Sequence, residues 1–291
     1  MRLLLPLLLL IVPISAQAQL EGVIDLHTHS APDSTPRPID ALELARIARR
    51  HGMRALVLKN HYTHTGSLAY MVAQTVPGIE IYGGITLNRS VGGINPVAVE
   101  HMARTTGNHG RIVWLPTFDS EHYHLTVRPN PNHVPISRDG ELLPEVTEVF
   151  SLMADLDLAL ATGHSSPAES LLVIREARAA GIERIIVTHP TAPQIAMPLE
   201  MQREAAELGA LIEYPIALVL RDDSTFEEFS EQIRELGPEH VALTTDLGQE
   251  LYPVHTDGFA IFINRFKEAG FSQGELDTMT KDNPIRFLGL P

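Results

Sequence analysis

Short apolar runs alternate with helical patterns along most of the chain. The runs are rich in valine, isoleucine and leucine and mostly lack polar alternation, which is typical of β-strands buried on both faces. We predict eight strands, over residues 23–29, 55–61, 79–87, 111–118, 158–164, 184–189, 210–214 and 241–246. Four helical patterns that are each followed by glycine lie between them, over 40–51, 95–106, 167–180 and 198–208.

Eight strand and helix units in one chain predict a single α/β domain, folded as a closed (β/α)₈ TIM barrel. An open doubly wound sheet would give a similar local pattern. The length of 291 residues suits one barrel, which typically needs about 250 residues. No linker and no internal repeat divides the chain, so we assign residues 19–291 to one barrel domain.

The first eighteen residues differ from the rest. An apolar run follows Met1 and Arg2, and residues 16–18 read Ala-Gln-Ala, the small-x-small pattern of a signal peptidase site. We predict a signal peptide over 1–18, cleavage before about Gln19, and an exported protein, periplasmic or secreted. A membrane anchor fits less well because the run is shorter than the roughly 20 residues needed to span a bilayer and contains Pro6 and Pro13.

The amino-acid composition limits the metal ligands and the binding partners that the chain can have. The chain has no cysteine, which excludes a lipid anchor, disulfides and thiolate ligands, so any metal must be held by nitrogen and oxygen. Its 22 basic and 36 acidic residues give a formal charge of −14, which opposes binding to nucleic acid or to an anionic membrane. We expect a small-molecule substrate, no nucleic acid, and no membrane anchor after signal cleavage. The sequence is also compatible with a homo-oligomer.

Metal-ligand residues recur at the ends of predicted strands. The segments DLHTHS, ATGHS, VTHP and TTDLG carry His27, His29, His164, His189 and Asp246. The histidines of the HxH pair share one face of their strand, with Asp25 expected below them. Because barrel enzymes keep their active sites at the carboxyl ends of the strands, we expect these side chains to meet on one rim and bind a divalent metal.

The second predicted strand, ALVLKNHY, contributes Lys59, a residue that is unusual in an apolar strand. A lysine has an ordinary pKa of about 10.4, and losing its proton at neutral pH costs roughly 4 to 5 kcal/mol, which nearby dications can supply. The neutral amine could take up CO₂ and form a carbamate that bridges two metals. A site with one metal, in which Lys59 is only a charged neighbour, is the alternative.

These motifs resemble the amidohydrolase superfamily of metal-dependent hydrolases, as an exported branch without a characterised substrate. DLHTH matches the first-strand HxH of that family, ATGH and VTHP its fifth- and sixth-strand histidines, TTD its eighth-strand aspartate, and NPIRFLGL its usual C-terminal segment. The resemblance implies that His27 and His29 bind the more buried metal and His164 and His189 the more exposed one. Asp246 would bind metal and take the proton of the attacking water, as the catalytic residue.

The chain departs from the family at the bridging ligand. Binuclear members usually carry the bridging lysine on the fourth strand, which here reads IVWLPTFD and has none. Lys59 would supply it from the second strand. The implied mechanism is attack by a metal-bound hydroxide on an amide, ester, lactone or phosphoester of a small molecule. With nitrogen and oxygen ligands Zn²⁺ is the default metal, as one or two ions, and Mn²⁺, Fe²⁺ or Co²⁺ would also fit.

Other polar residues are weaker candidates, and plain turn chemistry explains several of them. The long segment 117–143 after the fourth strand is expected to be an irregular loop, which is either a lid or substrate-recognition loop or an uninvolved surface excursion. Glu213 could support a ligand from behind. The candidate substrate-binding residues are Asp33, Arg37, Asn60, His61, Asn88 and His122.

Three other functions remain open at this level. A decarboxylase or isomerase could use the same metal site without hydrolysis. A barrel-type metal-dependent nuclease or phosphodiesterase shares the ligand types, but the charge of −14 opposes a polymeric substrate. A non-catalytic periplasmic metal- or ligand-binding barrel is less favoured because Asp246, the proton-transfer carboxylate, is present.

Overall fold

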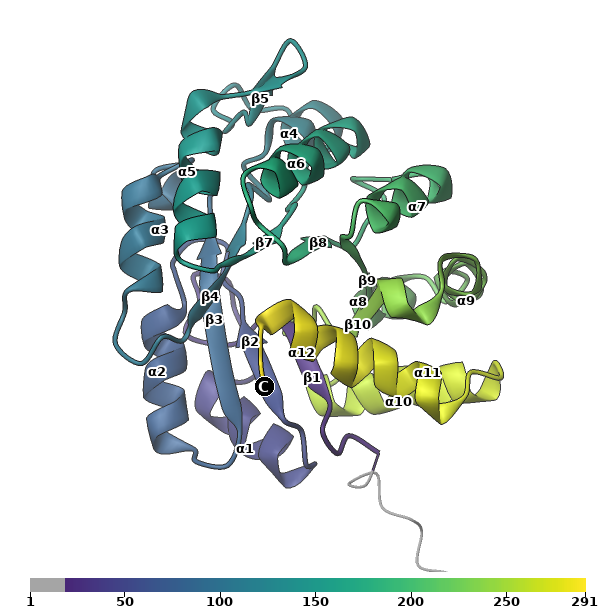
Figure 1. Cartoon of the computed structure of the whole chain (residues 1–291). Helices are drawn as coiled ribbons and strands as arrows, with labels where there is room; N and C mark the ends of the chain where they lie inside the picture. Colours follow the sequence, from purple (N-terminus) through teal and green to yellow (C-terminus); the bar gives the residue numbers. More distant parts are fainter. Residues whose placement is uncertain (1–18) are drawn as a thin grey trace, which may run out of the picture.

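The chain folds as a (β/α)₈ barrel, as predicted, in a computed structural model that describes residues 19–291. The predicted signal peptide, residues 1–18, lies outside this range. Eight parallel strands follow one another around the sheet, with helices outside them (Figure 1). They are β1 (Ile24–Thr28), β2 (Ala55–Leu58), β3 (Glu80–Thr86), β4 (Gly110–Trp114), β7 (Ala159–Ala161), β8 (Ile185–Val187), β9 (Leu211–Pro215) and β10 (Val241–Thr244).

The first and last strands close the barrel. The Asp246 N–H donates to the His27 carbonyl oxygen at 2.9 Å, and the His29 N–H donates to the Leu247 carbonyl oxygen at 2.9 Å. These bonds exclude an open sheet. They also place the HxH pair directly beside the segment that carries Asp246.

The helices cover the outside of the barrel, and all four that the sequence predicted are present. Asp40 caps α1 by accepting from the Glu43 N–H, and Ser166 forms a capping box with Glu169 at the start of α6. Within residues 19–291, no helix has both the length and the apolar character that crossing a membrane requires. The main helices are α1 (Ala41–Arg50), α2 (Gly66–Thr75), α3 (Pro96–Ala103), α5 (Pro144–Asp155), α6 (Pro167–Ala179), α7 (Leu199–Glu207), α8 (Ile216–Arg221), α9 (Thr225–Leu236), α10 (His255–Glu268), α11 (Gln273–Asp277) and α12 (Asn283–Leu288).

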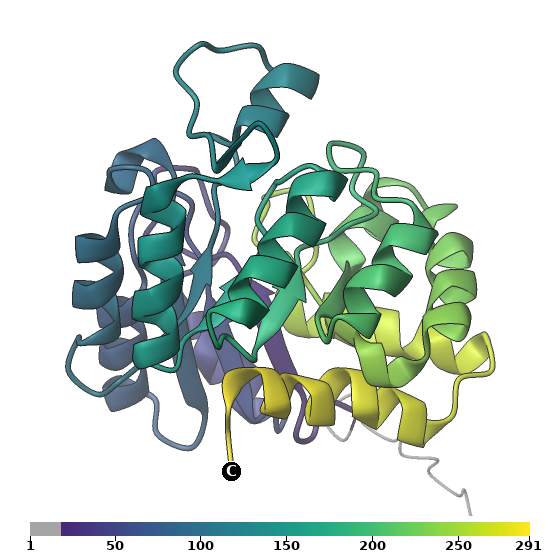
Figure 2. The ribbon, with the colours of Figure 1, turned by 45° about the horizontal axis from the view of Figure 1, so that its top comes forward.

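An apolar core fills the inside of the barrel. Alternate residues of the strands, such as Ile112 and Trp114 of β4, pack there. Phe287 and Leu288 of α12 join them, so the C-terminal helix covers the amino-terminal end of the barrel (Figure 2). The opposite end is left for the polar residues at the carboxyl ends of the strands.

The strands are shorter than predicted. The candidate ligands that follow β1 in the chain lie just beyond the hydrogen-bonded ends of their strands. β2 ends at Leu58 and β8 at Val187, so Lys59 and His189 follow the strands. A register shift between Asp25 and Thr28 also breaks the expected alternation. The carboxylate of Asp25 accepts from the Thr245 hydroxyl at 2.6 Å and from the His27 N–H group at 3.2 Å, while the neighbouring Ile24 joins the interior core.

The segment 117–143 is more ordered than predicted. It contains a short helix, α4 (Glu121–Thr126), and a hairpin of β5 (Ser137–Arg138) and β6 (Glu141–Leu142). It stands above the rest of the barrel at the end opposite α12 (Figure 2). Ser120 caps α4 and donates its hydroxyl to the His164 carbonyl oxygen at 2.9 Å, which ties this excursion to the rim.

Candidate metal centre

Three potential ligands converge where β1 meets the end of β10. One nitrogen each from His27 and His29 and one oxygen of Asp246 lie within 4.8 Å of one another. The Asp246 Oδ1 atom is 3.0 Å from His27 Nε2 and 3.1 Å from His29 Nε2. Atoms this close together could all contact one metal ion, and the two imidazoles and the carboxylate are a donor set that suits Zn²⁺.

His27 lies between two carboxylates. Its Nδ1 is 2.7 Å from Glu213 Oε1, and its Nε2 faces Asp246. Burial alone would lower the pKa of His27, but the negative charges of Asp246 and Glu213 raise it to about 9. The site therefore favours positive charge at the Nε2 position, which a metal ion would supply in place of the proton.

Lys59 lies in the same cluster. Its Nζ is 2.9 Å from His27 Nε2 and 5.3 Å from the ring centre of Trp114. Burial lowers the pKa of this amine to about 8, against the opposing influence of Asp246 and Glu213. An amine with this pKa is partly neutral at neutral pH, which is the form that reacts with CO₂.

His164 and His189 stand beside this group. Their ring centres are 5.1 Å apart, and the His189 ring lies 6.0 Å from that of His27. Burial lowers the pKa of both imidazoles, which keeps them in the neutral form that binds metals. Each has a buried Nδ1 without a hydrogen-bond partner among the described residues. Buried polar atoms of this kind are costly unless something occupies them, so these residues fit a bound metal.

The backbone is unusual at the same residues. His189 and Asp246 have φ angles of 27° and 49°, in a region that residues other than glycine rarely adopt and that is enriched at functional sites. Gly163, directly before His164, has φ +63°, and a Cβ atom there would lie 2.3 Å from the Leu115 carbonyl oxygen. Only glycine fits this close approach.

Several of the weaker candidates support the rim instead of facing the centre. Asp33 and Arg37 form a buried ion pair at 2.7 Å, and Arg37 also donates to the Gly248 carbonyl oxygen. Asn60 accepts from the N–H groups of residues 62 and 63 in a turn. Asn88 bonds to residues 61, 117 and 119. These contacts tie neighbouring βα loops together.

His61 does join the centre, whereas His122 does not. The His61 ring stacks on His29, with ring centres 4.9 Å apart. His122 lies on α4 and has no side-chain contact with the histidine cluster among the described residues. Its neighbour Tyr123 packs against His164, with ring centres 5.7 Å apart.

The sequence reasoning missed two aromatic residues. The ring centre of Phe118 lies 4.4 Å from that of His61 and 5.3 Å from that of His164, so Phe118 packs against both imidazoles. Trp114 lines the inside of the barrel next to Lys59 and His27. The alternation of IVWLP could have indicated the inward position of Trp114, but nothing in the sequence sets the position of Phe118.

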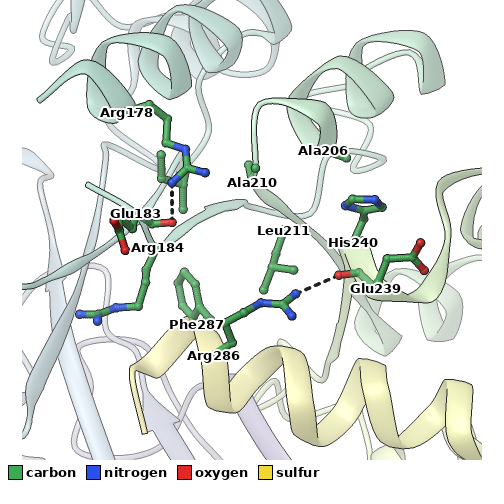
Figure 3. Close-up of a pocket in the computed structure, with 12 residues that line it drawn as sticks. Arg178, Glu183, Arg184, Ala206, Ala210, Leu211, Glu239, His240, Arg286 and Phe287 are labelled. Carbon is green, nitrogen blue, oxygen red and sulfur yellow. Dashed lines mark hydrogen bonds between the residues drawn. The ribbon is translucent and has the colours of Figure 1, made fainter. Parts of the chain in front are cut away.

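The opposite end of the barrel has a pocket of a different kind. It lies at the amino-terminal ends of β8 and β9, next to α12 (Figure 3). Its arginines are already engaged with the protein: Arg178 donates to the Glu183 carbonyl oxygen and Arg286 to that of Glu239. None of the candidate ligands lines it.

A family model described as "Family of unknown function (DUF6282)" matches residues 22–213, more than half of the chain. The chain belongs to this family. The matched region includes the four candidate metal-binding histidines and Lys59 and ends at Glu213, so that in this family member Asp246 lies beyond it. No curated protein matches the sequence.

Solved structures with the same barrel are hydrolases by description. An organophosphorus hydrolase from Deinococcus radiodurans superposes with a TM-score of 0.63 and 17% identity, over 94% of each chain. A mutant PTE-like lactonase from the same organism gives 0.62 and 16%, over 94% of this chain and 98% of that one. At this identity the likeness establishes the fold alone.

Proposed function

We propose that the protein is a metal-dependent hydrolase of the amidohydrolase type. The observation that carries this proposal is the convergence of His27, His29 and Asp246 within 4.8 Å, at the carboxyl end of a barrel, next to two histidines with unpartnered buried nitrogens. Barrel enzymes place their chemistry at this end. In the same proposal His164, His189 and Lys59 complete the ligand set.

Each residue then has a distinct task. His27 and His29 hold the inner position, and Glu213 orients His27 from behind. Asp246 has a side chain that is 19% exposed, against 1% for His27 and 2% for His29. It is therefore the member of this trio that incoming water and substrate can reach, and we assign it the acceptance of the proton from water and its delivery to the leaving group. The pKa of Asp246 is held well below its usual value by His27 and His29, against burial, so it is ionised.

One or two divalent ions, with Zn²⁺ the first choice, would lower the pKa of water and polarise the substrate's electrophilic centre. His27, His29 and Asp246 would hold the inner ion, and His164 and His189 the outer one. Lys59, as its carbamate, would lie between them. Binding of the second ion would depend on this lysine, which follows the end of β2.

The substrate that we propose is a small molecule with an ester, lactone, phosphoester or amide bond. Phosphotriesters and lactones come first in a test because structures with this fold are described as organophosphorus hydrolase and lactonase. A formal charge of −14 disfavours polyanionic substrates. Phe118 and Tyr123 would give the site an aromatic wall on the side of the excursion.

The test begins with expression of the full chain and metal analysis of the purified protein. The purified protein is then assayed on diethyl p-nitrophenyl phosphate, simple lactones, p-nitrophenyl acetate and N-acetyl amino acids. We expect turnover of at least one class, loss of activity after chelation, and recovery with Zn²⁺. Asp246→Asn should be inactive, whereas Asp139→Asn, in an exposed turn, should match the wild type.

Other outcomes distinguish the alternatives. Full activity in metal-stripped protein would contradict the proposal. A product whose mass lacks the added water would indicate a decarboxylase or isomerase on the same site. Ligand binding without turnover over the whole panel would indicate a binding barrel.

We also propose that the protein is exported after cleavage before Gln19 and acts without a membrane anchor. The support is the apolar run and Ala-Gln-Ala pattern of residues 1–18. N-terminal sequencing of protein recovered from the periplasm tests this directly. Size-exclusion chromatography with light scattering would test for a homo-oligomer.

A further inference from the structure

A buried chain of hydrogen bonds leads from Asn88 through Thr117 to His61, beside the candidate metal centre. Asn88 and Thr117 are fully buried, and His61 is 7% exposed. The three residues follow β3, β4 and β2, which are neighbours in the barrel. The chain ends on the imidazole that stacks against His29.

The orientation of the Asn88 amide is fixed by backbone groups. Its Oδ1 lies 2.9 Å from the Thr117 nitrogen and 3.3 Å from the Asp119 nitrogen. Backbone N–H groups can only donate, so this atom must be the oxygen. The Nδ2 group then donates to the His61 carbonyl oxygen at 2.9 Å and to Thr117 Oγ1 at 2.8 Å.

This orientation determines what the Thr117 hydroxyl can do. Its oxygen already accepts from Asn88, and its hydrogen needs an acceptor because the group is fully buried. Among the described residues the remaining partner is His61 Nδ1, at 2.9 Å. The hydroxyl therefore donates to Nδ1, and the hydrogen of the neutral ring is placed on Nε2.

A ring whose Nδ1 accepts a hydrogen bond has its single hydrogen on Nε2, so His61 is neutral. The Nε2–H group has no hydrogen-bond partner among the described residues. The ring lies between His29, at 4.9 Å, and Phe118, at 4.4 Å. A free donor thus stands next to the candidate metal ligands.

We propose that the Nε2–H group of His61 binds the oxygen of the substrate's carbonyl or phosphoryl group, and that Thr117 and Asn88 are positioning residues that fix its tautomer. This inference rests on the proposed function. It makes His61 a fixed neutral donor, which is aimed at the oxygen that gains negative charge during attack. Removing one donor of this kind typically lowers kcat by about 10²- to 10³-fold.

The first test reads the tautomer and does not depend on activity. In zinc-loaded protein labelled with ¹⁵N-histidine, long-range ¹H–¹⁵N correlations separate a protonated from an unprotonated ring nitrogen, and His61→Gln identifies the signals of His61. We expect hydrogen on Nε2 in the wild type and in Thr117→Ser, which keeps the hydroxyl. Thr117→Val, of nearly the same shape, should give a mixture of tautomers. A wild-type ring with its hydrogen on Nδ1 would overturn the inference.

The second test reads binding and catalysis. Diethyl phosphate, a tetrahedral oxygen probe, should shift the Nε2 resonance of His61, and an unchanged resonance would overturn the inference. On the best substrate of the panel, His61→Leu should lose about 100-fold in kcat. His61→Gln, which keeps an N–H donor, should recover part of that loss.

The two proposals can fail separately. A protein without hydrolytic activity contradicts the proposed function, while the tautomer and the probe titration still decide the role of His61. Conversely, an active enzyme in which His61→Leu has the wild-type kcat and KM keeps the proposed function and overturns the role of His61.

Discussion

His27 and Glu213 lie 186 positions apart in the chain, yet His27 Nδ1 and Glu213 Oε1 are 2.7 Å apart in the structure. With Nδ1–H donated to the carboxylate, the Nε2 lone pair is left for the candidate metal position. Glu213 also accepts from the Thr244 hydroxyl at 2.9 Å and from the His189 N–H at 3.0 Å. One carboxylate therefore aligns groups from three parts of the barrel.

Glu213→Gln should weaken metal binding by about 10- to 100-fold, the usual effect of losing a partner that orients a metal ligand. Both oxygens of Glu213 accept hydrogen bonds, whereas an amide must turn its NH₂ group toward one of the two donors. Competition with a chromophoric zinc chelator measures the affinity. Glu239→Gln, at the other end of the barrel, is the matched control, and equal affinities in the two variants would contradict this role.

Lys59→Met should abolish any carbamate in the protein. The chain has three lysines, Lys59, Lys267 and Lys281, so the spectrum of protein loaded with zinc and ¹³C-bicarbonate is simple to assign. We expect one carbamate signal in the wild type because burial brings the pKa of Lys59 to about 8. Lys281→Met should keep it. A wild-type protein that has no signal and binds a single zinc ion would indicate the one-metal site.

Asp25→Asn should change how stability depends on pH. Burial raises the pKa of Asp25 from 3.8 to about 7, in spite of its bonds to Thr245. The folded chain thus binds this proton more tightly than the unfolded chain. The resulting stabilisation is complete below pH 3.8 and is lost as the pH rises through about 7, by an amount on the order of 4 kcal/mol.

Urea unfolding of metal-free protein between pH 5 and 8 measures this difference. The wild type should lose stability relative to Asp25→Asn as the pH rises, because asparagine has no proton to release. Asp139→Asn, in an exposed turn, should follow the wild-type profile. Parallel profiles for the wild type and Asp25→Asn would mean that Asp25 stays charged when buried.

Gly163→Ala should destabilise the fold and displace His164. The added Cβ would lie 2.3 Å from the Leu115 carbonyl oxygen, in a residue with φ +63°. Gly140→Ala is the matched control because that glycine has φ +82° with nothing within 4 Å of its Cβ position. Both variants incur the cost of a left-handed alanine, roughly 1 to 2 kcal/mol.

Only Gly163→Ala adds the steric clash. The melting temperature and the zinc affinity should therefore both be clearly lower in Gly163→Ala than in Gly140→Ala. Equal melting temperatures and zinc affinities would show that the chain relaxes around the added methyl group without moving His164.

The sequence by itself determined the eight strand and helix units and the rim on which the candidate ligands gather. Eight buried apolar runs separated by helices can bury their surface only as a β/α barrel or an open sheet, and the residues after such runs lie at one end. Strand ends were overestimated because Lys59, His189 and Asp246 continue an apolar run in sequence while their backbone has left the ladder.

Only the tertiary structure decided which of those residues meet. Closure between β1 and β10 places Asp246 against His27, and the carboxylate of Asp25 bonds to Thr245 and to the His27 N–H group. The fixed ring of His61 depends on Asn88 and Thr117, which lie 27 to 56 positions away along the chain. Such contacts depend on the register between strands, which local patterns of apolar and polar residues do not encode, since those patterns report only which face of an element is buried.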